Sequence, residues 1–188
     1  NFINSTIDDT FHEMTKIIKN DINLRDYQEI ILNKFSNNIT NTSHFKKQFI
    51  LPTGAGKTII QNEFINSSID NGCKIFLTVA PTMMLVNQLG RSCDKNINYS
   101  CSSFIISSEG STDDGIQKIE NSTNMLDIVE KIIEANIFNI PIILSSTYKS
   151  FGKVVDSVYL LNKKIDLCIL DEAQHAIKKD NYDVIKGA

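Results

Sequence analysis

Residues 51–58 read Leu51-Pro52-Thr53-Gly54-Ala55-Gly56-Lys57-Thr58 and stand between a strand-like segment and a helix-like segment. Small residues at this position let the backbone wrap a phosphate, and the N-terminus of the following helix adds partial positive charge. Lys57 would reach the β/γ oxygens of a nucleotide, and the Thr58 hydroxyl would bind Mg²⁺. The general pattern G-x-x-x-x-G-K-[ST] asks for Gly where this chain has Leu51, so the pattern alone leaves open a glycine-rich turn beside a chance Lys-Thr pair.

A second signal lies near the other end of the sequence, where Asp171 and Glu172 directly follow the apolar segment 165–170. Ligands bind at the carboxyl ends of the strands in a parallel sheet. Asp171 would hold Mg²⁺ through its hydration shell, and Glu172 would polarise the water that attacks a γ-phosphate. Taken alone, two acidic residues after a strand are more often the favourable first turn of a helix. Together with residues 51–58 they indicate nucleotide hydrolysis.

Short runs rich in β-branched and aromatic residues alternate with helical patterns from position 47 onward. This alternation predicts an α/β fold with a mostly parallel sheet and flanking helices. The expected strands are 48–51, 74–79, 101–106, 140–144 and 165–170, and the expected helices between them are 56–69, 83–91, 124–136 and 149–161. Upstream, the spacing of apolar residues predicts helices over 1–23 and 26–35, followed by an Asn-rich loop over 36–43.

Length and composition narrow the class of protein. A chain of 188 residues with 41% hydrophobic and 22% charged residues is expected to fold as a single domain with additional N-terminal helices. No apolar run approaches the roughly 20 residues that cross a bilayer, and no signal sequence opens the chain. These features predict no membrane partner and an intracellular protein, in the cytoplasm or nucleus, or in a virion if the source is viral.

The net charge of −3 excludes a generally basic nucleic-acid binder, so any contact with nucleic acid must be local. The four cysteines form no C-x-x-C pair, which favours reduced thiols over a zinc or disulfide framework. Cys168 lies inside a predicted buried strand and is expected in the core.

Five segments resemble, in order along the chain, the motifs of the first RecA-like motor domain of superfamily 2 helicases and translocases, the DExD/H-box-like enzymes. Residues 53–58 resemble motif I, which does not require Gly at position 51, and Asp171-Glu172-Ala173-Gln174 resembles motif II. The other three are Leu24-Arg25-Asp26-Tyr27-Gln28 (adenine recognition), Ala80-Pro81-Thr82 (motif Ia) and Ser146-Thr147-Tyr148-Lys149-Ser150 (motif Ib/Ic). The first and last of these three look most like the restriction-subunit and repair-helicase branch. Met83 and Met84 depart from the commonest motif Ia, which often has an Arg or other polar residue there.

The resemblance implies a P-loop NTPase of RecA-like fold that uses ATP and Mg²⁺ to move on nucleic acid, DNA rather than RNA. The implied catalytic residues are Lys57, Asp171, Glu172 and Gln174, with Thr58 and Asp171 at the metal. The implied nucleotide-binding residues are Arg25, Gln28, Thr53, Gly54, Ala55, Gly56, Lys57 and Thr58. The implied nucleic-acid contacts are Pro81, Thr82, Thr147 and Lys149. Gln28 would read adenine, because a carboxamide both donates and accepts hydrogen bonds.

The same resemblance divides the chain into two segments. Residues 1–45 would form an N-terminal helical segment with the adenine-recognition motif, and residues 46–188 the first RecA-like domain, which stops before motif III. A second RecA-like domain of a longer protein would supply an arginine finger, so the isolated 188-residue piece is expected to be nearly inactive.

Two other functions remain open at this stage. The first is a non-catalytic module that uses ATP as a switch to bind nucleic acid, but such a switch does not need the water-activating carboxylate of Glu172. The second is a small-molecule P-loop kinase. The Ala-Pro-Thr and Thr-Tyr segments, and the absence of an Arg-rich lid from the sequence, argue against a kinase.

Overall fold

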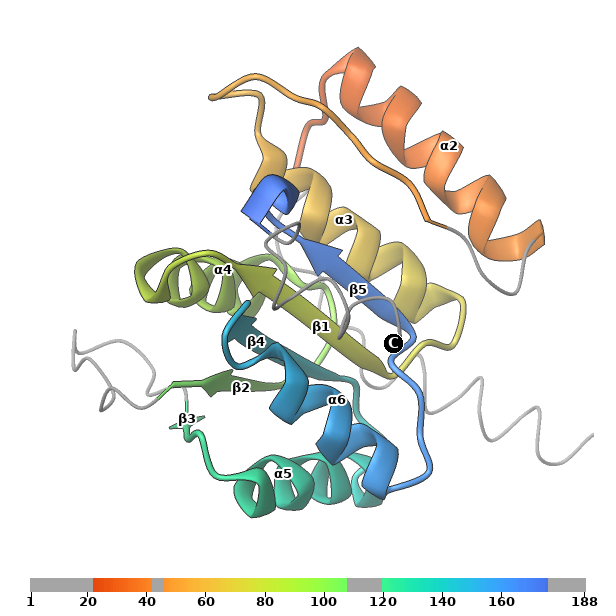
Figure 1. Cartoon of the computed structure of the whole chain (residues 1–188). Helices are drawn as coiled ribbons and strands as arrows, with labels where there is room; N and C mark the ends of the chain where they lie inside the picture. Colours follow the sequence, from red (N-terminus) through yellow and green to blue (C-terminus); the bar gives the residue numbers. More distant parts are fainter. Residues whose placement is uncertain (1–21, 42–45, 108–119, 176–188) are drawn as a thin grey trace, which may run out of the picture.

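The computed structural model of the chain describes residues 22–41, 46–107 and 120–175. At its centre is a sheet of five strands in the order β3-β2-β4-β1-β5 (Figure 1). In chain order the strands are β1 (Ile75–Ala80), β2 (Ser102–Ile106), β3 (Glu120–Asn121), β4 (Ile142–Thr147) and β5 (Leu167–Leu170). All four strand pairings are parallel, so the carboxyl ends of the strands meet at one edge of the sheet. The α/β fold with a parallel sheet is confirmed.

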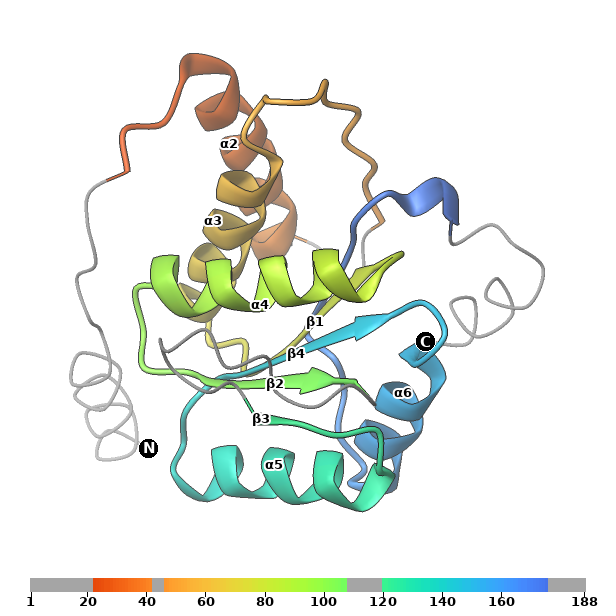
Figure 2. The same ribbon diagram turned by 90° about the vertical axis from the view of Figure 1, so that its left-hand side faces the viewer.

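Helices cover both faces of this sheet (Figure 2). The helices α3 (Lys57–Asp70) and α4 (Met83–Asn96) pack on one face, and α5 (Met125–Ile137) and α6 (Phe151–Leu160) on the other. Every side chain of β1 is buried, because this strand has a neighbour on each side and helices above and below. A 3₁₀ turn, η1 (Ala173–His175), follows β5.

Helix α2 (Asp26–Asn41) lies outside α3 rather than on the sheet (Figure 1). The two helices meet through Phe35, Ile60 and Phe64, and the Phe35 and Phe64 rings stack with their centroids 4.0 Å apart. This aromatic contact holds α2 against the outer face of α3.

Four of the five strands expected from the sequence are confirmed, with boundaries that differ by at most three residues. The prediction of a strand at 48–51 is wrong, because these residues pair with none of the described strands. Phe49 packs on the ring of Phe64, with centroids 5.3 Å apart, and the Ile50 side chain is 88% exposed. An apolar segment without a neighbouring strand gains no ladder of hydrogen bonds, so it runs along α3 as irregular backbone.

Three further expectations are corrected. The loop expected at 36–43 is helical as far as Asn41, and residues 42–45 lie outside the described residues. Helix α4 ends at Asn96 rather than 91, since the buried Cys93 continues its apolar face and the Asn96 side chain donates to the Ser92 carbonyl. Cys168 is exposed rather than in the core, because β5 is at the edge of the described sheet while α5 and α6 cover β2 and β4. The helix expected over 1–23 falls almost wholly outside the described residues.

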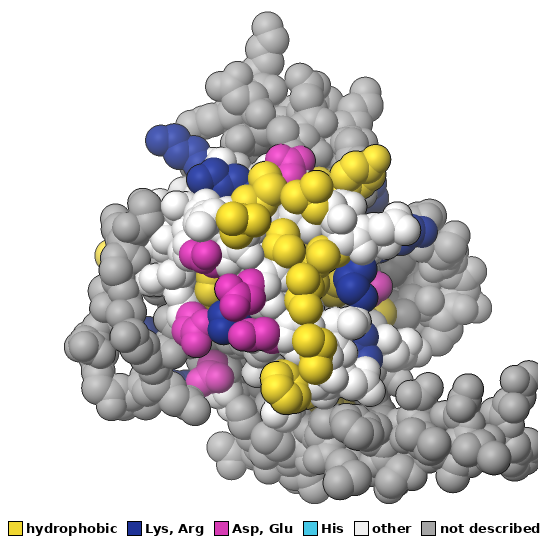
Figure 3. Space-filling view, turned by 90° about the horizontal axis from the view of Figure 1, so that it is seen from below, with side chains coloured by type: hydrophobic (Ala, Val, Ile, Leu, Met, Phe, Trp, Pro, Cys, Tyr) yellow, Lys and Arg dark blue, Asp and Glu magenta, His cyan; other side chains and the backbone are white. Residues whose placement is uncertain are grey.

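The outer face of α5 and α6 carries an apolar stripe (Figure 3). Its exposed side chains are Leu126, Ile133, Ile137, Phe138, Tyr159 and Leu160. Acidic side chains gather beside the stripe in this view. Glu120 and Glu134 both bind the Lys131 ammonium, at 2.6 and 2.7 Å. Within the described residues, no helix has the length and apolar character of a membrane span.

Candidate active site

The loop before α3 is shaped by two glycines in the left-handed region, Gly54 (φ 79°) and Gly56 (φ 70°). Between them the buried Ala55 donates its N–H to the Pro52 carbonyl at 3.3 Å. Helix α3 begins directly after Gly56, whose carbonyl accepts from the N–H groups of the first turn. None of the described hydrogen bonds uses the backbone N–H groups of Gly54, Gly56, Lys57 or Thr58. Free N–H donors at a helix N-terminus form an anion-binding site.

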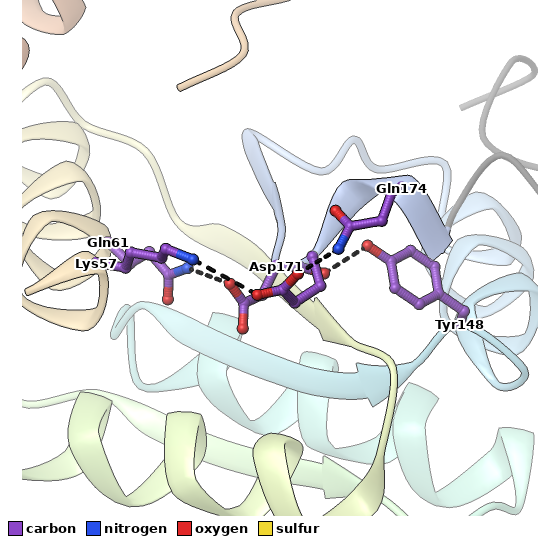
Figure 4. A network of polar contacts seen from close by, with 6 residues as sticks. Lys57, Gln61, Tyr148, Asp171 and Gln174 are labelled. Carbon is purple, nitrogen blue, oxygen red and sulfur yellow. Dashed lines mark hydrogen bonds and ion pairs between the residues drawn. The ribbon is translucent and has the colours of Figure 1, made fainter. Parts of the chain in front are cut away.

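Two contacts join the start of α3 to the end of β5 (Figure 4). The Lys57 Nζ lies 3.5 Å from the Glu172 Oε1, and the Gln61 Nε2 lies 3.4 Å from the Asp171 Oδ1. Glu172 has a positive φ of 50°, an uncommon conformation for a residue with a side chain. The Gln174 carboxamide donates to the second oxygen of Glu172. The fold therefore places four expected catalytic residues, Lys57, Asp171, Glu172 and Gln174, in one cluster.

Asp171 is fixed through its backbone. Its N–H donates to the Val79 carbonyl on β1, and its carbonyl accepts from the Tyr148 hydroxyl, both at 2.8 Å. Burial, with the nearby Asp171 carboxylate as the second cause, raises the pKa of the Tyr148 phenol. The phenol thus remains a hydrogen-bond donor, and it ties the end of β4 to the end of β5.

Gln28 reaches the loop from α2. Its side chain is only 3% exposed, with Oε1 accepting from the Arg25 N–H at 2.9 Å and Nε2 donating to the Ala55 carbonyl at 3.1 Å. The Tyr27 hydroxyl donates to the same carbonyl at 2.8 Å. The expected adenine-recognition segment is thus attached to the back of the loop, and the carboxamide already has one partner on each side.

Gly56 has a second constraint besides its backbone conformation. A Cβ built on it would lie 2.7 Å from the Gln28 Nε2, which is closer than van der Waals contact allows. The close approach of α2 to the loop therefore depends on a residue without a side chain at this position.

The four expected nucleic-acid contacts lie on the same edge of the sheet. Pro81 and Thr82 follow β1, and Thr147 ends β4, where its Cα pairs with that of Ala80. The Thr82 hydroxyl caps α4 by accepting from the Leu85 N–H at 3.4 Å. Lys149 is exposed in the turn before α6. Within the described residues, the structure brings none of these four side chains into a hydrogen bond with Lys57 or Asp171, and it does not join the Thr58 hydroxyl to Asp171.

The sequence did not identify Gln61 or the anchoring role of Tyr148. Gln61 stands four positions after Lys57, so the two side chains share one face of α3, and this spacing was the available signal. No sequence signal indicates that the Tyr148 hydroxyl reaches the Asp171 carbonyl.

Comparison with known proteins identifies a family whose model matches the sequence and solved structures with a similar fold. Residues 21–188 match the family model described as type III restriction enzyme, res subunit. A nuclease-deletion mutant of the type ISP restriction-modification enzyme LlaGI, in complex with a DNA substrate mimic, is 20% identical over 85% of this chain with a TM-score of 0.70. The ATP-dependent type ISP enzyme LlaBIII bound to DNA is 18% identical over 92% of this chain, also with a TM-score of 0.70. The chain spans 16% and 12% of the length of those two enzymes. No curated protein matches the sequence.

Proposed function

Because the chain belongs to the family of the type III restriction enzyme res subunit, we propose that it is the ATP-binding half of an ATP-dependent DNA helicase or translocase. The observation that carries this proposal is the 3.5 Å contact of Lys57 with Glu172 beside the unused N–H groups at the start of α3. A cation, an anion-binding helix terminus and a carboxylate then meet at one point. That combination fits hydrolysis of a triphosphate.

The loop residues fit the phosphates of Mg·ATP. Thr53, Gly54, Ala55 and Gly56 are small enough for close approach of the backbone, and the N–H groups of Lys57 and Thr58 have no other described partner. Lys57 exchanges the Glu172 carboxylate for the β/γ oxygens. Thr58 would bind Mg²⁺ through its hydroxyl and Asp171 through the hydration shell of the ion, and the ion would neutralise phosphate charge when bound. A site with few direct protein ligands suits this ion, since Mg²⁺ keeps much of its water shell in phosphate sites.

Glu172 acts as the base in this proposal. When Lys57 turns to the phosphates, the Glu172 carboxylate gives up its contact with the Lys57 ammonium, and one of its oxygens accepts the proton of the attacking water. Gln174, which donates to the other carboxylate oxygen, holds the group in orientation. Tyr148 fixes the backbone beside it through the Asp171 carbonyl.

The remaining expected residues have places in the same proposal. Arg25 and Gln28, within the N-terminal segment 1–45, border the base of the nucleotide, and residues 46–188 form the first RecA-like domain. Pro81, Thr82, Thr147 and Lys149 hold DNA phosphates at the carboxyl edge of the sheet, through backbone amides, hydroxyls and an ammonium. DNA is preferred to RNA because the family is that of a restriction enzyme. A protein with this substrate works inside the cell.

A second RecA-like domain completes the site with an arginine finger. Without this arginine the rate of hydrolysis falls by a factor of about 10³ to 10⁵. That factor corresponds to roughly 4 to 7 kcal/mol in the activation barrier. The 188-residue chain should therefore bind Mg·ATP but hydrolyse it very slowly.

The experiment uses the full-length protein that contains this chain, with ATPase rates measured with and without double-stranded DNA. We expect DNA to raise the rate, and Glu172→Gln to keep ATP affinity within about twofold while removing turnover, because the carboxamide cannot accept the proton. Full turnover by the Glu172→Gln protein, or a turnover by the 188-residue chain equal to the DNA-stimulated rate, would contradict the proposal.

A further inference from the structure

Gln61 lies one turn beyond Lys57 on α3 and joins that helix to the end of β5. Its amide Nε2 is 3.4 Å from the Asp171 Oδ1 (Figure 4). Together with the contact of Lys57 to Glu172, this bond connects α3 to both acidic residues. An uncharged donor beside a carboxylate can fix its direction without neutralising its charge.

The other end of the same amide is unsatisfied. The Gln61 Oε1 is buried and has no hydrogen-bond partner, a condition that it shares, among the described side chains, with the Ser146 hydroxyl. Rotating the amide by 180° would not solve this, because the oxygen would then face the Asp171 carboxylate. A buried acceptor without a donor is rare in folded proteins and indicates a missing partner.

We propose that Gln61 is a positioning residue for Mg²⁺: its amide nitrogen orients the Asp171 carboxylate, and its amide oxygen accepts a hydrogen bond from the water shell of the bound ion. This inference rests on the proposed function, since it needs the Mg·nucleotide at the start of α3. The water molecules around Mg²⁺ are strong hydrogen-bond donors. Such a donor is the partner that the Gln61 Oε1 lacks. Gln61 then supports the metal through Asp171 and through water, without touching the ion itself.

Two substitutions of Gln61 distinguish the hydrogen bonds made by its amide from the packing of its side chain. Gln61→Met keeps the length and approximate volume of the side chain but removes both the donor and the acceptor. Gln61→Ala removes the polar groups and the volume. If the amide acts on the metal, the two variants behave alike.

The test is titration of the 188-residue chain with ATP, once in excess Mg²⁺ and once in EDTA. For both Gln61→Ala and Gln61→Met we expect the Kd in Mg²⁺ to rise about 10-fold, as is typical when an outer-sphere partner of a metal ligand is removed. In EDTA the Kd should change less than about twofold. Gln88→Ala, the same chemical change at an exposed position on α4, is the matched control and should match the wild type in both buffers.

Three results would overturn the inference. Wild-type affinity in the Gln61→Met chain would show that the side chain only fills space. An equal loss in Mg²⁺ and in EDTA would show that Gln61 acts on the loop and not on the metal. Failure of the wild-type chain to bind ATP in either buffer would remove the proposed function and this inference with it.

Discussion

The Lys57 ammonium, at the start of α3, lies 3.5 Å from the Glu172 carboxylate, which follows the end of β5. Their side chains are 36% and 37% exposed, and ion pairs with that much contact with water contribute only about 0 to 1 kcal/mol. Such a contact is easily exchanged. In the proposed function, the pair would keep both side chains in place before a triphosphate arrives and would separate at little cost when it binds.

Removing the cation of this pair should weaken nucleotide binding. Lys57→Ala loses a charge-assisted hydrogen bond to phosphate and removes one positive charge from between Glu172 and the triphosphate, so we expect the Kd for Mg·ATP to rise about 10- to 100-fold. Titration calorimetry on the 188-residue chain measures this. Lys163→Ala is the control, because the Lys163 ammonium binds the exposed Asn136 side chain, away from the loop. Equal affinities of the two variants would place the phosphates elsewhere.

Gly56 should tolerate substitution less well than Gly72, although both have a positive φ, of 70° and 84°. Gly72→Ala meets nothing within 4 Å, so it should lose only the roughly 1 to 2 kcal/mol of a left-handed alanine. Gly56→Ala adds a Cβ at 2.7 Å from the Gln28 Nε2 and must displace a buried, doubly hydrogen-bonded amide. We expect a larger drop in Tm and a loss of ATP binding for Gly56→Ala alone. Identical melting curves would mean that α2 moves away freely.

Gln28 should make the site prefer ATP over GTP. Each side of its carboxamide has one partner in the structure, which leaves one N–H and one lone pair for the adenine edge. Guanine presents an acceptor where adenine has an amino group, so we expect GTP to bind about 5- to 10-fold more weakly. Gln28→Ala should abolish this difference. Equal affinity of the wild type for both nucleotides would restrict Gln28 to holding the loop.

Alkaline pH should destabilise the chain through Cys93. Burial, with Asp94 as a smaller cause, raises the pKa of this thiol to about 12 from an ordinary 9.0, and its Sγ donates to the Asn62 Oδ1 at 3.5 Å. Above pH 9 the unfolded chain loses the thiol proton while the folded chain keeps it, so stability falls by up to about 1.4 kcal/mol per pH unit. Below pH 9 this thiol adds no pH dependence.

Urea unfolding between about pH 8 and pH 10 tests the role of Cys93. The free energy of unfolding of Cys93→Ala should fall less steeply with rising pH than that of the wild type. Parallel curves for the two proteins would assign the alkaline loss of stability to other groups.

The sequence predicted the elements of the fold that depend on local composition. The strands β1, β2, β4 and β5 coincide with apolar runs that contain β-branched or aromatic residues, a composition typical of strands. Residues 48–51 have the same composition and still form no strand, because a strand also needs a neighbour, and local sequence does not specify one. The length of α2 was missed since its C-terminal half is rich in Asn, which favours turns when propensity alone is considered.

The motifs predicted which residues would gather at one edge of the sheet, but not the contacts between them. Residues 51–58 and 171–172 indicated where phosphates and carboxylates would meet, because parallel strands bring their carboxyl ends together. The contact of Gln61 with Asp171 joins residues 110 positions apart, and that of Gln28 with Ala55 joins residues 27 positions apart. Such pairs depend on how the helices pack on the sheet and on each other, and no local spacing predicts them.

The apolar stripe on α5 and α6 affects how the solubility of the chain depends on salt and temperature. Its large side chains, among them Leu126, Ile137 and Tyr159, remain in contact with water, and that contact becomes less favourable when sulfate or phosphate salts are added. The hydrophobic effect also weakens on cooling. The isolated chain should therefore be most soluble in the cold and in weakly salting-out buffers, and it should precipitate early in an ammonium sulfate series.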